Sequence, residues 1–436
     1  MKRSAKIAII FFGYFLIALI LLTNNLVPQQ EVVLKITEGV PAISLALPKF
    51  IIHSDNNECQ QAASEIYEVL SADLKYSRVF QLLPQSYYSY IRPLDPKNIF
   101  FKDWESIQAR VLVVGEISGN SENLIFEAKL YDVRSAKFIV GRKYQGNQAS
   151  RREMAHRLAN EIMKAFGEKP IFTSKIVFVS DRDGNDELYL MDYDGANQIR
   201  LTFNRVRDYM PAIAPDAQKI AFTSYRETVA GLYLMDLTKK KIIPISTNGT
   251  NFAAAFSPDG KKLAFCSTMD GNAEIYVATL GENGIQSVKR LTFNEAIDTA
   301  PCFSPTGREI AFVSDRGGTP QIYIMDAEGS NVRRVSFGGT YHDAPAWSPD
   351  GERIVYVSRL DNIFDLYVLN LRTNQIIKLT ESNARHESPC WSPDGRHIVF
   401  SSNLSGQIQI FSIDYDGTNL RRLTSQGNNK LPDWSN

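Results

Sequence analysis

The sequence predicts a small α+β domain followed by an all-β, six-bladed β-propeller that is closed by the C-terminal strand. The first observation is a five-residue segment, Trp391-Ser-Pro-Asp-Gly395, which recurs along the second half of the chain. The second is a nearly constant spacing, 43 to 47 residues, between equivalent apolar strands of the repeat. The third is a mixture of helix-like and strand-like patterns, without repeats, that precedes it. Four short strands in a unit of about 40–45 residues are typical of a propeller blade.

The recurring segment has the composition of a tight turn between two strands. Trp347 to Gly351 repeats it letter for letter, while Phe256 to Gly260 and Phe303 to Gly307 carry Phe in place of Trp. Ala214 to Ala217 is a degenerate copy that lacks the glycine. Proline presets φ at the second turn position, and glycine accepts the left-handed conformation that a Cβ atom resists. We therefore interpret the motif as structural, with the aromatic residue packing one blade on the next.

The phase of the repeat predicts how the propeller closes. The apolar strands of the six units begin near residues 176, 220, 263, 310, 354 and 398, and the region as a whole covers residues 172–436. It begins at the second strand of a unit and ends in Pro432 to Ser435, a partial copy of the first strand. The last segment is therefore expected to supply the innermost strand of the first blade. Closure of this kind removes the exposed edges of an open sheet.

The N-terminus has the pattern of an export signal. Lys2, Arg3 and Lys6 precede an apolar run from Ile7 to Leu22. The run is slightly long for a signal core and slightly short for a span of about 20 residues, and no good Ala-x-Ala-like site follows it. Residues 1–25 are thus predicted to be either a signal peptide or an N-terminal membrane anchor. In both cases the bulk of the chain is expected to lie outside the cytoplasm.

Residues 31–168 are predicted to form the α+β domain, because strands and helices alternate there without a regular βαβ order. Asn56 or Asn57 is expected to begin a helix that runs to about Leu74, and Ser150 is expected to cap a last helix that ends before Gly167. The remaining expected elements are strands at 32–36, 43–52 and 110–116, a short helix around Trp104, and a hairpin of 124–131 with 138–144.

Composition argues against several classes of ligand. The chain has 48 basic and 48 acidic residues, so its net charge gives no reason to expect nucleic acid or an anionic membrane surface. Its four cysteines, which are expected as free buried thiols, show no metal-binding spacing. His156 lies near the apolar face of the last helix, and we expect it to pack or to form a hydrogen bond. We therefore expect no cofactor and no metal. These cysteines are Cys59, Cys266, Cys302 and Cys390.

Five short segments in the two halves of the chain are informative together: Glu31-Val32, Val113-Val-Gly-Glu116, Leu130-Tyr-Asp132, Ala155-His156 and Met191-Asp-Tyr-Asp-Gly195. With the repeated turns, they resemble the TolB family, the periplasmic propeller proteins of the Tol-Pal system. The resemblance runs from about residue 31 to the end, and its departures are the missing cleavage site and the turn at Ala217. It implies a non-enzymatic adaptor that binds the peptidoglycan-associated lipoprotein Pal on a propeller face and the inner-membrane protein TolA through its N-terminal segment. It also implies a role in outer-membrane integrity and in constriction at cell division.

The resemblance places Pal on the loops that join the outermost strand of one blade to the innermost strand of the next. A ring of His, Tyr, Arg and acidic residues there can offer aromatic anchors and charge-assisted bonds to a protein. The expected TolA segment comprises Glu31, Val32, Val33, Leu34, Lys35 and Ile36. The expected Pal-binding residues are Arg207, Asp208, Asn251, Asp298, Thr299, Tyr341, His342, Asp343, Arg385, His386, Glu387 and Lys430.

Two other functional classes stay open at this point. A hydrolase of the propeller-containing peptidase type would append a domain with a Gly-x-Ser-x-Gly elbow, and the sequence has no such motif. A triad built from His342 or His386 is the remaining enzymatic option, and we predict no catalytic residue. An exported propeller that binds a glycan or small ligand in its central channel is the alternative to the adaptor. Aspartates such as Asp208 lack the spacing of a calcium loop. A monomer is expected.

Overall fold

The computed structural model describes residues 42–54, 56–281, 284–360 and 362–435. The expected signal or anchor at 1–25, the strand at 32–36 and the TolA segment lie outside these residues. The described residues of the α+β domain and of the propeller belong to one compact unit. In this part of the chain, no helix has the length and apolar character that crossing a bilayer requires.

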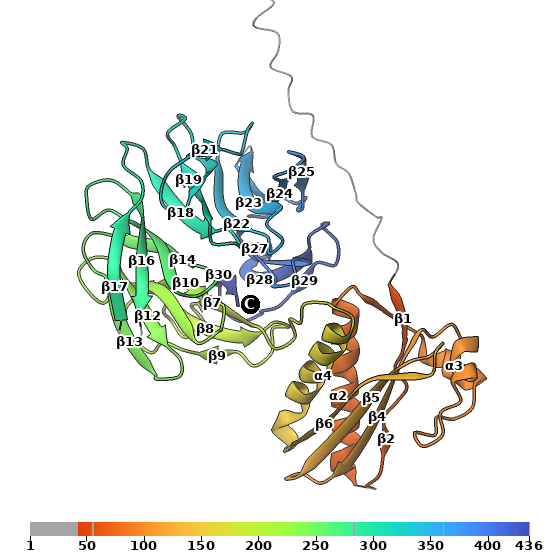
Figure 1. Cartoon of the computed structure of the whole chain (residues 1–436). Coiled ribbons are helices and arrows are strands. Elements are labelled where there is room, and N and C mark those ends of the chain that lie inside the picture. The colour runs from red at the N-terminus through yellow and green to blue at the C-terminus, as the bar shows by residue number, and fades with distance from the viewer. Residues whose placement is uncertain (1–41, 55, 282–283, 361, 436) are drawn as a thin grey trace, which may run out of the picture. The chain divides into compact units, whose positions relative to one another are not determined.

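The α+β domain consists of one mixed β-sheet with helices packed against it (Figure 1). Its strand order is β3-β1-β4-β5-β6, and β2 pairs with β4. Alternate residues of β4 face opposite sides, so Val111 and Val113 join the core under α2 and α4, while Leu112 and Val114 pack with Trp104 of α3. The elements are β1 (Ile43–Ala46), β2 (Ile51–Ile52), α2 (Asn57–Tyr76), β3 (Phe80–Leu82), α3 (Phe101–Ser106), β4 (Val111–Gly119), β5 (Leu124–Asp132), β6 (Lys137–Gly146) and α4 (Arg151–Ala165).

The helix boundaries follow the sequence at α2 but not at α4. The Asn56 side chain accepts a hydrogen bond from the Cys59 backbone N–H at 2.8 Å, which caps α2 as expected. The expectation that Ser150 caps α4 is wrong, because its side chain makes no cap bond there. Asn147 instead accepts from the Ala149 N–H and starts a short 3₁₀ turn, Gln148–Ser150, that leads into the helix. The expected strand at 43–52 is also interrupted, at the segment containing Pro48, which has no N–H to donate to a ladder.

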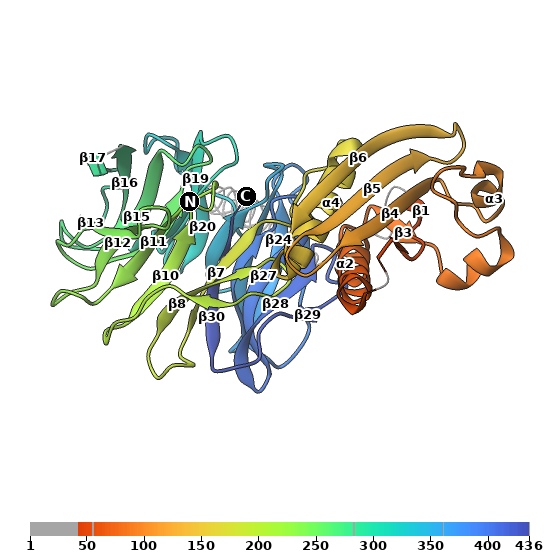
Figure 2. The ribbon, with the colours of Figure 1, turned by 90° about the horizontal axis from the view of Figure 1, so that it is seen from below.

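Six four-stranded antiparallel sheets follow and form the blades of the propeller, so the predicted fold class is confirmed (Figure 1). Figure 2 shows the blades from the side, each with its strands twisted across one another. The second to sixth blades are β10 (Asp208–Ile213) to β13 (Lys241–Ser246), β14 (Asn251–Phe256) to β17 (Gly284–Arg290), β18 (Asp298–Phe303) to β21 (Arg333–Arg334), β22 (His342–Trp347) to β25 (Ile376–Lys378), and β26 (His386–Trp391) to β29 (Arg421–Arg422).

The inner strands of these blades are followed by regular second and third strands. These are β11 (Lys219–Ser224) and β12 (Gly231–Asp236), β15 (Lys262–Ser267) and β16 (Glu274–Gly281), β19 (Glu309–Ser314) and β20 (Gln321–Asp326), β23 (Arg353–Leu360) and β24 (Ile363–Asn370), and β27 (His397–Ser405) and β28 (Gln407–Asp414). The Ser-Pro-Asp-Gly turns join the first to the second strand. In the turn of blade six, the Ser392 hydroxyl donates to Asp394 and accepts the His397 N–H, which fixes the turn.

The first blade is closed by the end of the chain, as the phase of the repeat predicts. β30 (Asn429–Trp434) pairs with β7 (Lys175–Ser180), and the blade continues through β8 (Glu187–Asp192) to β9 (Ile199–Arg200). Trp434 lies opposite Ile176 in this ladder and donates its indole N–H to the Ser174 hydroxyl at 2.7 Å. The ring is thus held shut by strands that lie more than 240 residues apart in sequence.

Every innermost strand is distorted at the same place. The residue before each inner-strand proline, or before Ala254 in blade three, has a positive φ of 48° to 55°, and the ladder shifts register there. A β-bulge of this kind bends the strand and re-aims the side chains that flank it. The six residues concerned are Met210, Ala253, Ala300, Ala344, Ser388 and Leu431.

Candidate functional site: the loop face of the propeller

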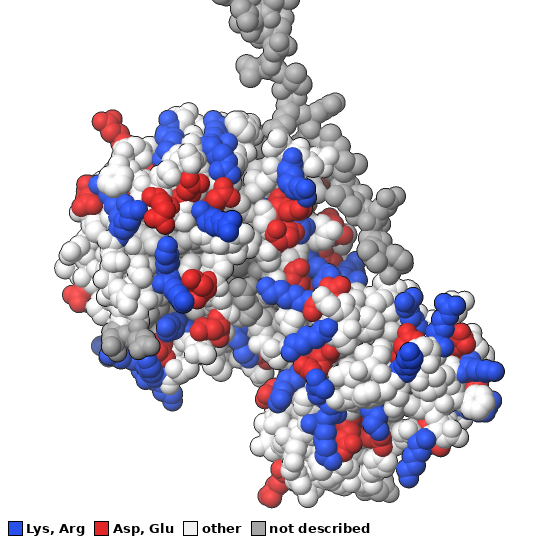
Figure 3. Space-filling view, in the orientation of Figure 1, with Lys and Arg blue, Asp and Glu red and all other residues white. Residues whose placement is uncertain are grey.

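Six loops that connect one blade to the next lie on the same end of the propeller, and we call this end the loop face. They comprise residues 201–207, 247–250, 291–297, 335–341, 379–385 and 423–428, each between an outermost and an innermost strand. Lys and Arg are interspersed with Asp and Glu over the side of the propeller drawn in Figure 3, as the balanced composition suggests.

Five of the twelve expected site residues are buried, so the expectation that all of them form an exposed ring is wrong. Each is the first residue of an innermost strand, and its side chain holds the blade together. Asp208, for example, accepts hydrogen bonds from Ser224 and Arg226, and Asp298 accepts from Arg316 at 2.8 Å. The buried five are Asp208, Asn251, Asp298, His342 and His386.

The other seven expected residues remain accessible, and six of them form ion pairs or hydrogen bonds between side chains. Arg385 and Glu387 form an ion pair at 2.6 Å, and the Tyr341 hydroxyl donates to Asp343 at 2.7 Å. Opposite charges thus stand side by side, with part of each side chain open to a partner. The seven are Arg207 and Arg385, which are exposed, and Thr299, Tyr341, Asp343, Glu387 and Lys430, which are half-buried.

Three phenylalanines on the loop face were missed by the sequence reasoning. Phe203, Phe293 and Phe337 occupy equivalent positions in three blades and are 75%, 73% and 56% exposed. An arginine guanidinium lies over each ring at about 5 Å (4.8, 4.8 and 5.2 Å). Exposed aromatic and Arg side chains are the types that dominate binding energy at protein interfaces. The repeated Leu-Thr-Phe-Asn segments at 201–204 and 291–294 were the signal that could have found them.

A cavity of about 760 Å³ runs along the innermost strands. Its lining is dominated by alanine and proline, and Asp343 and Glu387 contribute to it. Cys390 donates to the Asp433 carboxylate at 3.1 Å, and burial raises the pKa of both groups above their ordinary values. All four cysteines are free, as expected, although Cys302 and Cys390 are only half-buried.

The two buried histidines of the loop face give stability a pH dependence. Burial lowers the pKa of His342 and of His386. Below the ordinary histidine pKa of about 6.5, the unfolded chain therefore binds more protons than the folded chain. The free energy of unfolding consequently decreases as the pH is lowered. Each histidine contributes at most about 1.4 kcal/mol per pH unit. We expect His342→Gln combined with His386→Gln to flatten the loss of stability between about pH 6.5 and 5, measured by urea unfolding. An unchanged slope, equal to that of a His53→Gln control on the surface, would contradict this.

Comparison with known proteins agrees with both parts of this architecture. The TolB amino-terminal domain model matches residues 32–139, and the TolB beta propeller domain model matches residues 163–364 and 341–436. A crystal structure of TolB from Acinetobacter baumannii aligns over 91% of this chain and 97% of that chain, with a TM-score of 0.75 and 27% identity.

The Tol-Pal system protein TolB of Desulfosudis oleivorans is 34% identical over 244 residues, or 55% of each chain. That of Cereibacter sphaeroides (strain ATCC 17025) is 32% identical over 220 residues, or 49% of each. The chain thus spans about half the length of the curated relatives it matches.

A small α+β domain followed by a closed six-bladed propeller defines a class of two-domain propeller proteins. Within that class, the two family matches together cover both domains and the structural match covers most of the chain. The chain belongs to the TolB family.

Proposed function

We propose that the chain is a periplasmic, non-enzymatic adaptor of the Tol-Pal system that binds Pal through the loop face. The observation that carries this proposal is the match to TolB across both domains, together with relatives that are named Tol-Pal system protein TolB. The predicted export signal in residues 1–25 is consistent with a periplasmic location. The segment Glu31–Ile36 is proposed to bind TolA, by adding or releasing a strand. Through these two contacts the protein would support outer-membrane integrity and constriction at division.

The accessible pairs of the loop face support Pal binding there. Asp343 and Glu387 lie at equivalent positions of neighbouring blades, and each has a polar partner that a ligand can replace. The exposed phenylalanines add apolar anchors on the outer part of the same face. A partner that covers both would bury aromatic surface and retain charge-assisted hydrogen bonds at the centre.

The geometry around His386 supports an adaptor over a hydrolase. The imidazole Nε2 accepts or donates a hydrogen bond with Ser382 Oγ at 2.9 Å, and Asp365 Oδ1 lies 4.0 Å from this same nitrogen. A catalytic triad needs the carboxylate on Nδ1 and the hydroxyl on Nε2, so that the base is oriented while it takes the proton. Here Nδ1 has no hydrogen-bond partner among the described residues, and the side chain is buried.

Charge reversal at Asp343 and Glu387 tests the proposed Pal site. The double variant Asp343→Lys, Glu387→Lys is expected to weaken Pal binding at least about 10-fold in a calorimetric titration, because it removes two acceptors and places like charges near Arg385 and Lys430. Glu328→Lys is the matched control, since Glu328 is an exposed carboxylate in a turn at the other end of the propeller. Unchanged affinity of the double variant would place Pal elsewhere. Retention of the protein on a glycan column, with no Pal binding, would favour a channel that binds sugar.

A further inference from the structure

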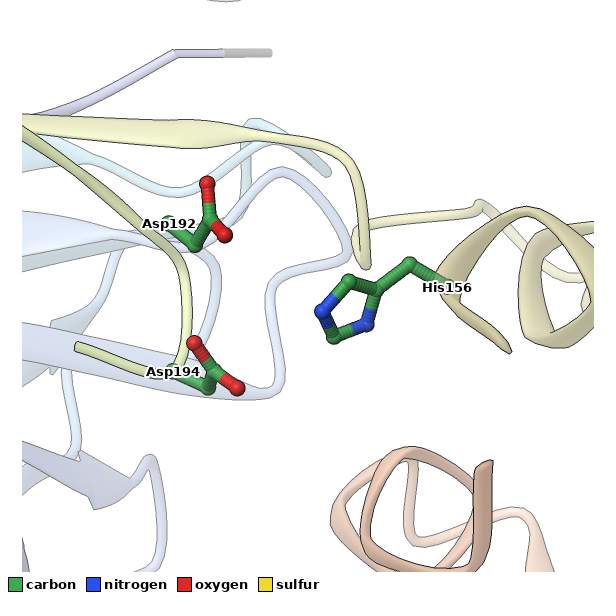
Figure 4. A group of neighbouring side chains, drawn as sticks. All are labelled: His156, Asp192 and Asp194. Atoms are coloured by element: carbon green, nitrogen blue, oxygen red, sulfur yellow. The ribbon is translucent and has the colours of Figure 1, made fainter. Parts of the chain in front are cut away.

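A buried histidine and three carboxylates meet where α4, α2 and the first blade come together, and we call this group the His156 cluster. His156 lies on α4, Asp192 is the last residue of β8, and Asp194 lies in the turn that follows β8. Asp73, from α2, completes the group. Figure 4 shows the imidazole of His156 projecting from its helix toward Asp192 and Asp194. None of these residues belongs to the loop face.

One ring nitrogen of His156 is held by a hydrogen bond, and the other nitrogen is available to bind a ligand. Its Nδ1 atom is 2.8 Å from Asp73 Oδ2, so in the neutral ring Nδ1 carries the proton and donates it to that carboxylate. Its Nε2 atom then presents a lone pair, and it has no hydrogen-bond partner among the described residues, although His156 is only 4% exposed. A carboxylate behind a histidine whose other nitrogen is free is the arrangement found behind metal ligands.

The ligand atoms lie at a spacing that suits one ion. One atom each from His156, Asp192 and Asp194 is within 4.8 Å of the others. Bonds of about 2.0–2.2 Å from a tetrahedral ion to nitrogen and oxygen place neighbouring ligand atoms about 3.3–3.6 Å apart. The distance between any two of these ligand atoms therefore has to shorten by at most about 1.5 Å to close the site.

The other contacts of the two carboxylates leave room for a cation. Asp192 accepts from Lys175 and from Asn197, and Asp194 accepts from Arg152 and from the Ala196 N–H. With Asp73, the described residues of the cluster include three carboxylates, of which Asp192 and Asp194 are paired with Lys175 and Arg152, while the Arg421 guanidinium donates to the Asp194 backbone oxygen at 3.1 Å. A carboxylate oxygen has two lone pairs, so each aspartate can keep these bonds and still bind a metal.

We propose that His156, Asp192 and Asp194 bind a divalent transition-metal ion of the zinc class, with Asp73 as the positioning residue behind the histidine. One imidazole and two carboxylates suit zinc, whereas calcium and magnesium prefer oxygen ligands alone. The ion joins α4 of the α+β domain to the first blade. The proposed metal site differs from the expectation of a metal-free chain, and it does not depend on a role in the Tol-Pal system.

The full-length chain, freed of metal by a chelator, provides the test. Zinc is expected to bind at one equivalent by calorimetry and to raise the melting temperature, while magnesium and calcium do neither. His156→Gln is expected to lower zinc affinity by at least 10-fold, and Asp73→Asn by about 10–100-fold. Two controls are expected to bind as the wild type does: His53→Gln, which removes an exposed histidine beside Glu116, and Asp416→Asn, which alters the same Asp-Tyr-Asp-Gly motif in blade six. Equal zinc binding by wild type and His156→Gln overturns the proposal, as does the absence of binding.

A second measurement is needed because Asp73 also accepts from Tyr193, so its variant can lose stability for another reason. Crystals of the wild-type chain grown with zinc are expected to give an anomalous peak next to His156 Nε2. Anomalous peaks confined to surface sites such as His53, with none at His156, overturn the proposal even if the variants do not fold.

Discussion

Replacement of Trp434 by alanine is expected to lower the free energy of unfolding by about 3–5 kcal/mol, the usual cost of removing a large buried aromatic side chain. Trp434 is 6% exposed and packs in the core beside Ile176 and Met191. Its loss also leaves the Ser174 hydroxyl without its indole donor. The effect is large because β30 is the only strand that covers the inner edge of β7 among the described residues.

Removal of residues 431–436 is expected to cost more than the single substitution. It takes away Asp433, which accepts the Ile213 N–H at 2.7 Å, and Ser435, which accepts the Lys175 N–H at 2.9 Å. Urea unfolding of both variants measures the loss, and Phe203→Ala is the control, because that ring is exposed and its change should stay within about 0.5 kcal/mol. If the truncated chain unfolds at the wild-type urea concentration, the ring does not depend on the terminal strand.

Replacement of Tyr193 by alanine is the second large effect we expect, about 3–5 kcal/mol. Tyr193 is fully buried in the turn after β8, where its ring contacts Phe172 and Tyr76 and its hydroxyl donates to Asp73. Tyr193→Phe keeps the ring and removes only this donor. It should cost about 1–3 kcal/mol, the penalty for leaving a buried acceptor less satisfied.

The same motif in blade six supplies the control for Tyr193. Tyr415 follows an aspartate in an identical Asp-Tyr-Asp-Gly segment, but it is half-buried and lies beside the Arg353 guanidinium. Tyr415→Ala should therefore cost clearly less than Tyr193→Ala in the same denaturation experiment. Equal losses at both positions would mean that the packing of the turn itself, and not the contact with Asp73 and the α+β domain, sets the stability.

The propeller could be predicted from the sequence because its signals are local and repeated. The Ser-Pro-Asp-Gly turn depends on the chemistry of four neighbouring residues, and the partial copy at Trp434 shows the missing strand of the first blade. The N-terminal cap of α2 at Asn56 could also be predicted, because it depends on neighbouring residues alone. Ser150 failed as a cap because Asn147, three residues earlier, begins a 3₁₀ turn that no periodic pattern marks.

The burial of side chains on the loop face was predicted less well than the fold. The direction of each side chain there depends on how its strand is aligned with the neighbouring strand. The left-handed residue in each innermost strand, such as Ala344, shifts the ladder between Asp343 and Ala346. His342 consequently points into the blade, while Asp343 stays accessible. The His156 cluster could not be predicted at all, since α2, α4 and the first blade meet only in the folded chain.

Hydrogen exchange of the protein with and without the soluble domain of Pal tests the central claim most directly. Pal is expected to slow exchange in the loops of the loop face, above all at residues 335–341 and 379–385, which lead into Asp343 and Glu387. The Ser-Pro-Asp-Gly turns at the other end, such as 257–260, should exchange as before. Protection confined to those turns, or no change anywhere on saturation with Pal, would contradict an adaptor that holds Pal by its loop face.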